Sequence, residues 1–301
     1  MRIGGPATVA VTGAAGTLGQ EVVAAAPGWA TVVPRTRADG DLSRADQAQA
    51  ALLAAAPEII VHCAAYTDVD GATRAPEQAW RGNALATRHV AEVAACVRAR
   101  LLYVSTDYVF DGTAATPYTE RSAPHPLNAY GASKLAGERE ASRAPGSLIV
   151  RTQWLFGPGG RSFVRAILEA ARVGKPLRIV EDECGCPTYA PDLARGIWRV
   201  LETSATGVLH LTNTGACSRL ELAGAALAEA GLTGVKVTGI PGSEWPSPTV
   251  RPRNAVLASE RLEELGLAPL RPWREALREY VAGLRDRWHA EAGVDESDDR
   301  P

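Results

Sequence analysis

The sequence has few of the residues that mark disulfide frameworks and metal centres. Its five cysteines are an odd number in a chain of 301 residues, which argues against a disulfide framework and favours a reducing compartment. Cys184 and Cys186 form the one close pair, but a CxC pattern without two further Cys or His at metal spacing does not make a zinc site. The five histidines form neither an HxxxH nor an HExxH pattern. We therefore expect no metal centre.

Long apolar runs and an excess of one charge sign are absent as well. No apolar segment approaches the ~18–20 residues of a membrane helix, and glycines interrupt the first apolar stretch too early for a signal-peptide core. The net charge is −2 with both signs interspersed, so the chain lacks the basic stripe that nucleic acid or an anionic membrane needs. We expect a cytoplasmic globular protein that binds neither.

A glycine-rich turn follows the first predicted strand, Ala7–Val11. The spacing Gly-x-x-Gly-x-x-Gly within Thr12–Gly19 lets the chain turn tightly, lets backbone N–H groups approach a pyrophosphate, and lets the next helix pack against the strand. Because the motif lies between a strand and a helix pattern, it predicts a dinucleotide site rather than a plain Gly-rich turn. The contacts expected here are those of Gly13, Gly16, Thr17, Leu18 and Gly19.

The residues after the second predicted strand, Ala30–Val33, indicate which dinucleotide binds. An NAD site usually has Asp or Glu at this point for the ribose 2′-hydroxyl, whereas Arg accommodates the 2′-phosphate of NADP. This chain has Arg35 and Arg37 there, and two guanidinium groups fit a phosphate dianion. We expect NADPH, with NADH possible; the alternative is a solvated arginine pair.

Alternating strand and helix patterns extend through the first half of the chain. That order predicts an α/β fold with a parallel, doubly wound sheet of the Rossmann type and right-handed crossovers. A Gly-Pro-Gly-Gly break at 157–160 precedes segments richer in Pro and Gly, which favours a smaller C-terminal substrate-binding lobe. We expect an NADP-binding domain at 1–156 to which later segments cross back, a lobe mainly at 157–288, and a disordered acidic tail at 289–301.

Polar and small residues follow two further predicted strands, Ile59–His62 and the apolar run that begins at Leu101. In an open α/β sheet, ligands bind at the carboxyl ends of the strands. Small residues after the first of these strands would admit a dinucleotide. The residues expected at this edge are Ala64, Ala65, Tyr66, Ser105, Thr106 and Asp107.

Tyr130 and Lys134 are four residues apart in a helix pattern, so they project from one face of the helix. A phenol is a weak acid at neutral pH, with a pKa near ~10, but a neighbouring cation stabilises the phenolate and lowers that pKa. We expect Lys134 to make Tyr130 a usable proton donor. Such pairs also arise by chance on solvated helix faces, so the other motifs carry much of the argument.

Several longer stretches together resemble the dTDP-4-dehydrorhamnose reductases of the extended short-chain dehydrogenase/reductase family. The resemblance extends from about Thr8 to Trp273, nearly the whole chain. Its GxxGxxG and YxxxK motifs are general to the superfamily, whereas STDYVFDG together with RTxWLFG is specific to this branch. The stretches are Ile59–Asp70, Ser105–Gly112, Tyr130–Glu138, Arg151–Gly157, Gly185–Thr188 and Arg251–Asn254.

The resemblance implies NADPH-dependent reduction of the C4 ketone of a dTDP-4-keto-6-deoxyhexose. Tyr130 would protonate the developing alkoxide, Thr106 would hydrogen-bond the same oxygen, and Lys134 would assist Tyr130 and hold the nicotinamide ribose. Asn83 matches an asparagine that holds a water in a proton relay with the lysine; the alternative is an Asn on a solvated helix face. The pair expected beside the adenine is Asp41 and Leu42.

The same resemblance assigns substrate contacts to Trp154 and Arg251, besides Thr106, Asp107 and Tyr108. An indole offers a flat apolar face to a deoxysugar, and an Arg beside a proline can chelate a diphosphate through its planar fork. The alternatives are a core aromatic for Trp154 and a surface residue for Arg251.

Two competing functions share this fold. Nucleotide-sugar dehydratases and epimerases also begin by hydride transfer, but dehydratases follow the Thr-Asp pair with a Glu that assists elimination, and Tyr108 stands in that place. A simple reductase is therefore favoured. The regulatory β-type subunits of methionine adenosyltransferase are similar to these reductases, and the motifs do not exclude a non-catalytic NADP-binding subunit.

Two departures from the family pattern concern assembly and the sugar pocket. Some members dimerise around Mg²⁺ held by two glutamates; Glu21 matches the first position, but Pro191 falls at the second, so a metal-linked dimer is not favoured. Gln153 replaces the usual Ser before Trp154 and should reshape the sugar pocket. We expect a monomer or a homodimer.

Overall fold

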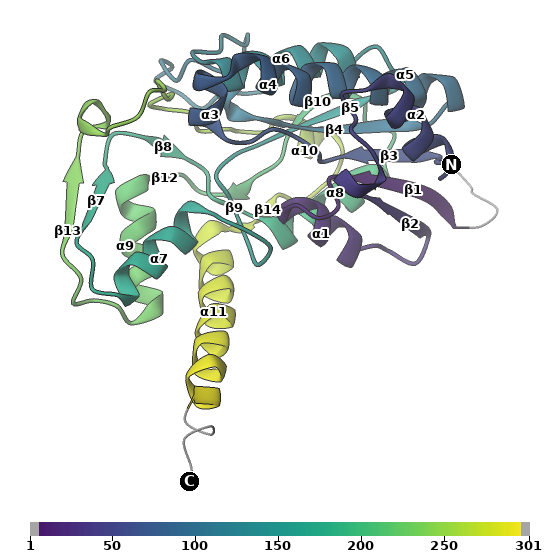
Figure 1. Cartoon of the computed structure of the whole chain (residues 1–301). Coiled ribbons are helices and arrows are strands. Elements are labelled where there is room, and N and C mark those ends of the chain that lie inside the picture. The colour runs from purple at the N-terminus through teal and green to yellow at the C-terminus, as the bar shows by residue number, and fades with distance from the viewer. Residues whose placement is uncertain (1–5, 296–301) are drawn as a thin grey trace.

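A computed structural model describes residues 6–295, and a parallel six-stranded sheet forms its centre (Figure 1). Each strand pairs in parallel with its neighbours, as the alternation of strand and helix predicts. In spatial order the strands are β10 (Gly207–His210), β5 (Leu148–Thr152), β4 (Arg100–Thr106), β3 (Ile59–His62), β1 (Ala7–Thr12) and β2 (Ala30–Arg35).

The strand order contains one reversal, between β1 and β3. From β1 the chain crosses to β2 on one side and then returns to β3 on the other side of β1. The loops that follow β1 and β3 therefore diverge at this point and leave a crevice at the carboxyl ends of the strands, where doubly wound sheets bind their ligands. The glycine-rich turn and the segment after His62 both lie there.

Side chains of each strand alternate between two separate cores. Val9 and Val11 of β1 belong to one core and Ala10 to the other, as the two-residue period of a strand requires. Helices cover both faces: α1 and α8 lie on the first core, and α2, α5 and α6 on the second (Figure 1). Their bounds are α1 Thr17–Ala24, α2 Ala45–Leu53, α5 Ala86–Val97, α6 Ala129–Ala141 and α8 Ala190–Leu201.

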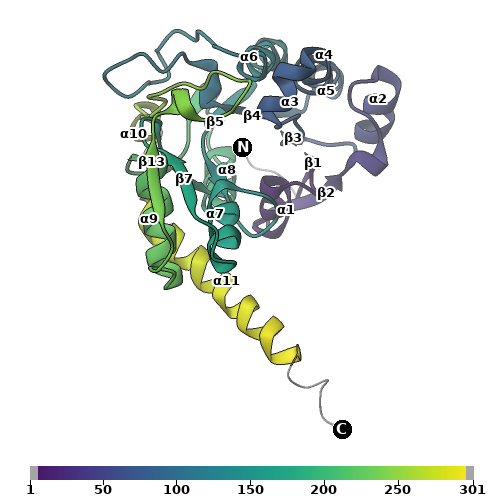
Figure 2. The ribbon, with the colours of Figure 1, turned by 60° about the vertical axis from the view of Figure 1, so that its left-hand side comes forward.

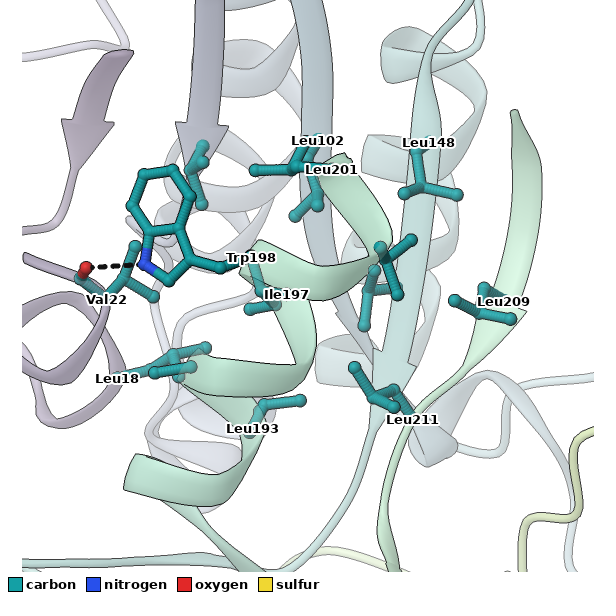
Figure 3. Close-up of a cluster of buried hydrophobic side chains, with 14 of the residues drawn as sticks. Leu18, Val22, Leu102, Leu148, Leu193, Ile197, Trp198, Leu201, Leu209 and Leu211 are labelled. Atoms are coloured by element: carbon teal, nitrogen blue, oxygen red, sulfur yellow. Dashed lines mark hydrogen bonds between the residues drawn. The ribbon is translucent and has the colours of Figure 1, made fainter. Parts of the chain in front are cut away.

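Helix α8 comes from the chain beyond residue 156 but packs on the sheet beside α1. Its apolar face, with Leu193 and Ile197, points at strand residues such as Leu102 (Figure 3). The indole Nε1 of Trp198 donates to the carbonyl of Val22 at 2.9 Å, which joins α8 to α1. Strand β10 likewise returns to the sheet edge. Residues 190–210 thus belong to the sheet layers, not to a separate lobe.

The other late segments form a smaller lobe around its own core (Figure 2). Its larger elements are α7 (Phe163–Arg172), α9 (Arg219–Ala230), α11 (Trp273–Asp295) and the parallel pair β7 (Leu177–Val180) and β13 (Val237–Ile240). Short strands join the lobe to the sheet layers: β6 (Leu155–Phe156) with β9 (Thr188–Tyr189), β8 (Cys184–Gly185) with β12 (Cys217–Ser218), and β11 (Asn213–Thr214) with β14 (Leu270–Pro272). The one-turn elements are η1 (Arg37–Asp39), η3 (Asp107–Val109), η4 (Gly242–Glu244) and α10 (Arg261–Glu264).

Helix α11 extends into the first part of the tail predicted at 289–301. The helix continues through Asp295 instead of ending at Trp288, and it projects from the body of the molecule in both views (Figures 1 and 2). The residues after Trp288 are too polar to form a core. They can still extend a helix whose earlier turns are already held by packing. Residues 296–301 lie outside the described residues. Within 6–295, no helix combines the length and apolarity needed to cross a membrane.

The helical segment that contains Asn83 is divided. After α3 (Val69–Arg74), the chain forms α4 (Pro76–Trp80), a π-helical turn η2 (Arg81–Leu85), and then α5. A π turn inserts an extra residue into a helix and changes the direction of the side chains around it. Asn83 lies inside this turn.

Candidate active site

The glycine-rich turn lies against the segment after β3. Gly13 has φ +66°, and a Cβ on it would come 2.6 Å from the backbone N of Ala64. A Cβ on Gly19 would come 2.1 Å from the carbonyl oxygen of Gly13, so both positions require glycine. No side chain caps the first turn of α1, and uncapped helical N–H groups favour an anion. The cradle fits the pyrophosphate of a dinucleotide.

The other predicted cofactor residues line the same crevice in different ways. Thr17 Oγ1 donates to the carbonyl of Gly159 at 2.8 Å, which joins α1 to the 157–160 break. The side chain of Leu18 is buried in the core, so only its backbone can face a ligand. Ala64 is half-buried and Ala65 exposed, and both leave room beside the turn.

The two arginines after β2 differ. Arg35 Nε donates to the carbonyl of Ala51 at 2.6 Å, and its Nη1 to that of Pro34 at 3.2 Å, so this guanidinium is held by the backbone. Arg37 is exposed at the start of η1. The two predicted arginines therefore differ: backbone carbonyls hold the guanidinium of Arg35, whereas that of Arg37 makes no hydrogen bond or ion pair with residues 6–295.

The pair predicted beside the adenine forms a fixed loop near Arg37. Asp41 Oδ1 accepts from the N–H of Ser43 at 2.9 Å, and this bond lowers its pKa. The carbonyl of Leu42 lies 3.0 Å from His89 Nδ1, and the Leu42 side chain packs against the core.

Tyr130 and Thr106 meet at the carboxyl end of β4. Thr106 is buried at the end of the strand, and its hydroxyl donates to Asp107 Oδ1 at 2.9 Å. Tyr130, one residue into α6, lies close enough for the Thr106 hydroxyl to lower the pKa of its phenol. Lys134 lies one turn further along α6, where its ammonium donates to the carbonyl of Val104 at 2.6 Å. The three predicted catalytic side chains therefore converge on one edge of the sheet.

The acidities of this group differ from the sequence prediction. Burial raises the pKa of Tyr130 above its ordinary value, although the nearby Thr106 hydroxyl opposes the rise. Lys134 does not lower it, because its ammonium is directed to Val104 and lies 4.1 Å from the ring centroid of Tyr103. Burial lowers the pKa of Lys134 to about 7, opposed by the charge of Glu138. Tyr130 thus carries its proton throughout the neutral range, as a proton donor must.

Asn83 is fully buried, which excludes the solvated-face alternative. Its Oδ1 accepts from the N–H of Tyr66 at 2.8 Å, and its Nδ2 donates to the Tyr66 carbonyl at 3.0 Å and to Ser133 Oγ at 2.9 Å. Both amide hydrogens are used. The side chain therefore fixes the segment after β3 to the catalytic helix α6, between Tyr130 and Lys134.

A buried ion pair and a close glycine contact seat α6 on the sheet. Arg151 of β5 donates twice to Glu138, at 2.7 and 2.8 Å, and Ser105 donates to the same carboxylate at 2.6 Å. A Cβ on Gly131 would come 2.0 Å from the carbonyl of Tyr108. These contacts hold the Tyr130 ring 5.3 Å from the Tyr108 ring.

Asp107 is buried and held on both oxygens. Thr106 donates to its Oδ1, and Gln153 Nε2 donates to its Oδ2 at 3.1 Å. Burial raises the pKa of Asp107 to about 6, while the bonds from Thr106 and Gln153 oppose the rise. Gln153, which replaces the Ser of the family pattern, thus contacts the aspartate that follows Thr106 at the end of β4.

Two arginines lie near Tyr108. Arg251 donates to Asp70 at 2.8 Å and to Ser247 at 2.5 Å. The guanidinium of Arg219 lies near Glu183, at 3.5 Å, and both cations lower the pKa of Tyr108, which burial raises to about 12. Arg251 is therefore not a free surface residue.

Trp154 has a strained backbone and a partly covered ring. Its φ of +46° is rare for a large residue. Arg219 lies over the indole, 3.7 Å from the ring centroid, and a Cβ on Gly185 would come 2.6 Å from Cε2. The ring is half-buried and packs against the core of the smaller lobe. The guanidinium of Arg219 therefore covers part of the indole surface that was predicted to contact a sugar.

Arg219 is the pocket residue that the sequence pattern does not reveal. The stretch Ser218 to Glu221 forms a capping box at the start of α9, and that pattern predicts a helix N-terminus but not what the helix faces. Arg219 reaches the site only because β12 pairs with β8 next to Trp154.

The positions considered for a shared metal lie on α1 and α8. Glu21 is close to Arg195, whose charge lowers its pKa while burial raises it. Pro191 occupies the first turn of α8. Among the described residues, no group of three His, Cys, Asp or Glu side chains could hold a metal ion.

Known proteins share this sequence and fold. The family model described as RmlD substrate binding domain matches residues 7–285. A dTDP-4-dehydrorhamnose reductase of Mycolicibacterium smegmatis is 36% identical over 92% of this chain and 85% of its own length. A probable dTDP-4,6-dihydroxy-2-methyloxan-3-one 4-ketoreductase of Streptomyces antibioticus is 40% identical over 89% of this chain and 92% of its own.

A solved structure agrees with the sequence relatives. The dTDP-4-dehydrorhamnose reductase of Bacillus anthracis in complex with NADP superposes with a TM-score of 0.89 at 34% identity, covering 92% of this chain and 99% of its own. A dTDP-glucose 4,6-dehydratase of Streptomyces venezuelae, at 22% identity and a TM-score of 0.79, shares the fold alone. The named relatives favour the reductase prediction over the regulatory-subunit and dehydratase alternatives. This chain belongs to the dTDP-4-dehydrorhamnose reductase family.

Proposed function

We propose that the protein uses NADPH to reduce the C4 ketone of a dTDP-4-keto-6-deoxyhexose. The observation that carries the proposal is the convergence of the Tyr130 and Thr106 hydroxyls beside the glycine-rich cradle. NADPH, when bound, supplies the hydride. The family relatives act as dTDP-sugar ketoreductases by name, which supports the same substrate class here.

Tyr130 donates the proton that the reduced ketone oxygen needs. Its raised pKa keeps the phenol protonated at neutral pH, and burial beside Tyr108 excludes water from the transfer. Thr106 orients the same oxygen. General-acid help of this kind contributes roughly 10²- to 10⁴-fold.

Lys134 and Asn83 hold the catalytic helix and the cofactor side of the crevice. The Lys134 ammonium, one turn from Tyr130 and bound to the Val104 carbonyl, is placed to hydrogen-bond the nicotinamide ribose. Asn83 bonds Tyr66 and Ser133 and so sets the distance between the cofactor cleft and α6. Both amide hydrogens of Asn83 are already used. A relay water would therefore have to donate to the amide oxygen of Asn83 or to the carbonyl oxygen of Tyr66.

Arg37 selects the 2′-phosphate, and Asp41 and Leu42 border the adenine. Arg37 is the exposed guanidinium of the pair after β2, while Arg35 shapes the loop through Ala51. Arg251 and Arg219 flank Tyr108 and supply the positive charge that a diphosphate needs.

The experiment is to incubate the protein with NADPH and a panel of 4-keto sugars that differ only in the nucleotide. We expect NADPH absorbance to fall with the dTDP sugar, and Tyr130→Phe to lose more than 100-fold in kcat while it binds NADPH as tightly as the parent. Turnover that ignores the nucleotide, or a Tyr130→Phe variant with parental kcat, would overturn the proposal.

A further inference from the structure

A histidine is buried in an otherwise apolar layer of the sheet. His62 is the last residue of β3 and is fully buried, on the face where Ala10 and Ile60 belong to the second core. Its register partner on β1 is Thr12, which is fully buried as well. Helix α5 adds a third buried polar side chain, Thr87. Polar groups in such a layer destabilise the fold unless they are hydrogen-bonded, so the bonds of these three side chains show what the protein gains from them.

The three side chains form a chain of hydrogen bonds whose direction is fixed. Thr87 Oγ1 donates to the carbonyl of Asn83 at 2.6 Å, and a hydroxyl has one proton only. At the 3.2 Å contact between Thr87 Oγ1 and His62 Nε2, the proton therefore belongs to Nε2. In a neutral imidazole Nδ1 is then an acceptor, and Thr12 Oγ1 donates to it at 2.6 Å. The backbone N–H of Ala64 begins the chain by donating to Thr12 Oγ1 at 3.5 Å.

The surroundings of His62 keep its imidazole neutral. Burial and the charge of Lys134 lower the pKa of His62 to about 3. A second proton, on Nδ1, would face Thr12 Oγ1 and would displace the Thr12 proton from the acceptor that it uses. The hydrogen bonds and the nearby charge thus favour one tautomer, with the proton on Nε2.

The two ends of this chain reach the two sides of the crevice. Thr12 directly precedes Gly13, whose backbone packs against the segment after β3. At the other end, Asn83 belongs to the π turn, and its amide donates to Ser133 Oγ at 2.9 Å. Ser133 in turn donates to the carbonyl of Tyr130 at 2.7 Å. A buried series of hydrogen bonds, continued through the atoms of Asn83, therefore joins the glycine-rich cradle to the backbone of Tyr130.

We propose that His62 is a positioning residue, a neutral imidazole with its proton on Nε2, whose two bonds hold the glycine-rich cradle and the catalytic helix α6 at a fixed separation. The role rests on the proposed function for its reaction. The Nδ1 bond to Thr12 supports the cradle and hence the affinity for the dinucleotide. The Nε2 bond to Thr87 supports the π turn and α6, and hence the rate of proton transfer from Tyr130.

Two amide substitutions each keep one half of the chain. In His62→Asn, the amide oxygen replaces Nδ1 as the acceptor for Thr12, but the shorter side chain does not reach Thr87. We expect this variant to bind NADPH within about threefold of wild type and to lose about tenfold or more in kcat. In His62→Gln, the NH₂ replaces Nε2–H as the donor to Thr87, and the acceptor for Thr12 is lost. This variant should raise Kd for NADPH about tenfold and keep kcat within about threefold.

A matched control and the partner threonines extend the test. His125 is exposed, so His125→Gln should change neither Kd nor kcat. Thr12→Val should weaken NADPH binding as His62→Gln does, and Thr87→Val should lower kcat as His62→Asn does. Because Thr12→Val and His62→Gln remove the same bond, the variant that combines them should be no worse than the more affected single variant. The threonine variants keep the histidine itself, so they test the same division where a histidine variant does not fold.

Nitrogen-15 NMR of protein labelled in histidine reads the tautomer without substrate or cofactor. We expect the signals of His62, assigned by their loss in His62→Gln, to show a protonated Nε2 and an unprotonated Nδ1 from pH 6 to pH 8. A proton on Nδ1 in this range, alone or together with one on Nε2, would reverse the direction of the chain and overturn the proposal.

The kinetics can overturn the proposal as well. If affinity and rate fell by the same factors in His62→Asn and His62→Gln, or if both variants matched wild type, the two bonds would not have separate roles. Failure of the wild type to reduce any 4-keto sugar would instead remove the proposed function. NADPH binding and the NMR tautomer would still test the role of His62.

Discussion

The guanidinium of Arg219 lies over the indole of Trp154, 3.7 Å from the ring centroid. The same guanidinium lowers the pKa values of Asp107 and Tyr108, so its charge reaches the catalytic edge of the sheet. The antiparallel pair β8 and β12 positions it. A ligand bound next to Tyr108 would therefore contact the Arg219 guanidinium as well as the indole that it covers.

Arg219→Leu should weaken substrate binding. The change keeps apolar contact with Trp154 but removes a charge whose hydrogen bonds to a diphosphate are worth about 1.5–3 kcal/mol. We expect KM for the nucleotide sugar to rise roughly 10- to 100-fold with KM for NADPH unchanged. Arg274→Leu is the matched control, since Arg274 covers a different indole, that of Trp273 at the start of α11, at 4.4 Å. Equal effects of the two changes would contradict a substrate role for Arg219.

Lys134→Met should separate stability from activity. Burial lowers the pKa of Lys134 to about 7, so between pH 7 and the unfolded value near 10.5 the unfolded chain binds more protons. Stability from this group therefore rises with pH and is lost as pH falls through 7. We expect the variant to gain about 1–3 kcal/mol at pH 6, a gain that shrinks by pH 9, and to lose most turnover.

Thermal unfolding at pH 6 and pH 9 measures this difference. Lys175 is exposed, so Lys175→Met should change neither stability nor kcat. A Lys134→Met protein less stable than wild type at pH 6 would show that the bond to the Val104 carbonyl outweighs the cost of burying the charge.

Arg37→Ala should shift the cofactor preference. We expect KM for NADPH to rise tenfold or more and KM for NADH to stay unchanged, because only the 2′-phosphate loses a charge-assisted bond. Arg35→Ala should raise KM for NADPH less and should also destabilise the protein, because Arg35 bonds the Ala51 carbonyl. Arg44→Ala, which removes an exposed arginine nearby, is the control. A wild type that uses NADH as well as NADPH would contradict the arginine interpretation.

Local patterns in the sequence predict the sheet and the catalytic edge well. The alternation of strands with helices sets a parallel order, and a parallel order brings the ends of β1, β3 and β4 to one edge, so Gly13, Ala64 and Thr106 lie together. The YxxxK spacing then puts Tyr130 and Lys134 on one face of α6. These relations depend on periodicity and on topological rules that hold for most such sheets.

Contacts between distant segments account for what the sequence does not predict. Gln153 and Ala255, which share a hydrogen bond, are 102 positions apart, and no pattern in either segment indicates the other. The prediction that Lys134 lowers the pKa of Tyr130 was wrong for a related reason. The spacing places Lys134 near Tyr130, but the carbonyl of Val104 on β4 determines where the ammonium points. Composition likewise does not report that Leu284 and Trp288 pack against the lobe's core and so anchor the helix that extends to Asp295.

The close seating of α6 makes a final prediction about Gly137. A Cβ at this position would come 2.4 Å from the hydroxyl of Tyr103 and 2.6 Å from the carbonyl of Asn83. Both atoms belong to rigid elements, so Gly137→Ala must push α6 away from β4 and η2. Overpacking of this kind costs typically 1–3 kcal/mol. Because Tyr130 and Lys134 lie on the same helix, kcat should fall by at least tenfold as well.

Gly224→Ala is the matched control for this change. Gly224 lies inside α9 with nothing within 4 Å of an added Cβ, so alanine there should stabilise the protein by up to about 1 kcal/mol through helix propensity. Urea unfolding of the two variants should show changes of opposite sign in the free energy of unfolding. Steady-state kinetics should show a loss of kcat in Gly137→Ala alone. If Gly137→Ala instead matched Gly224→Ala in both measurements, α6 would have room to move without disturbing Tyr130, and the close seating would not be what positions the proton donor.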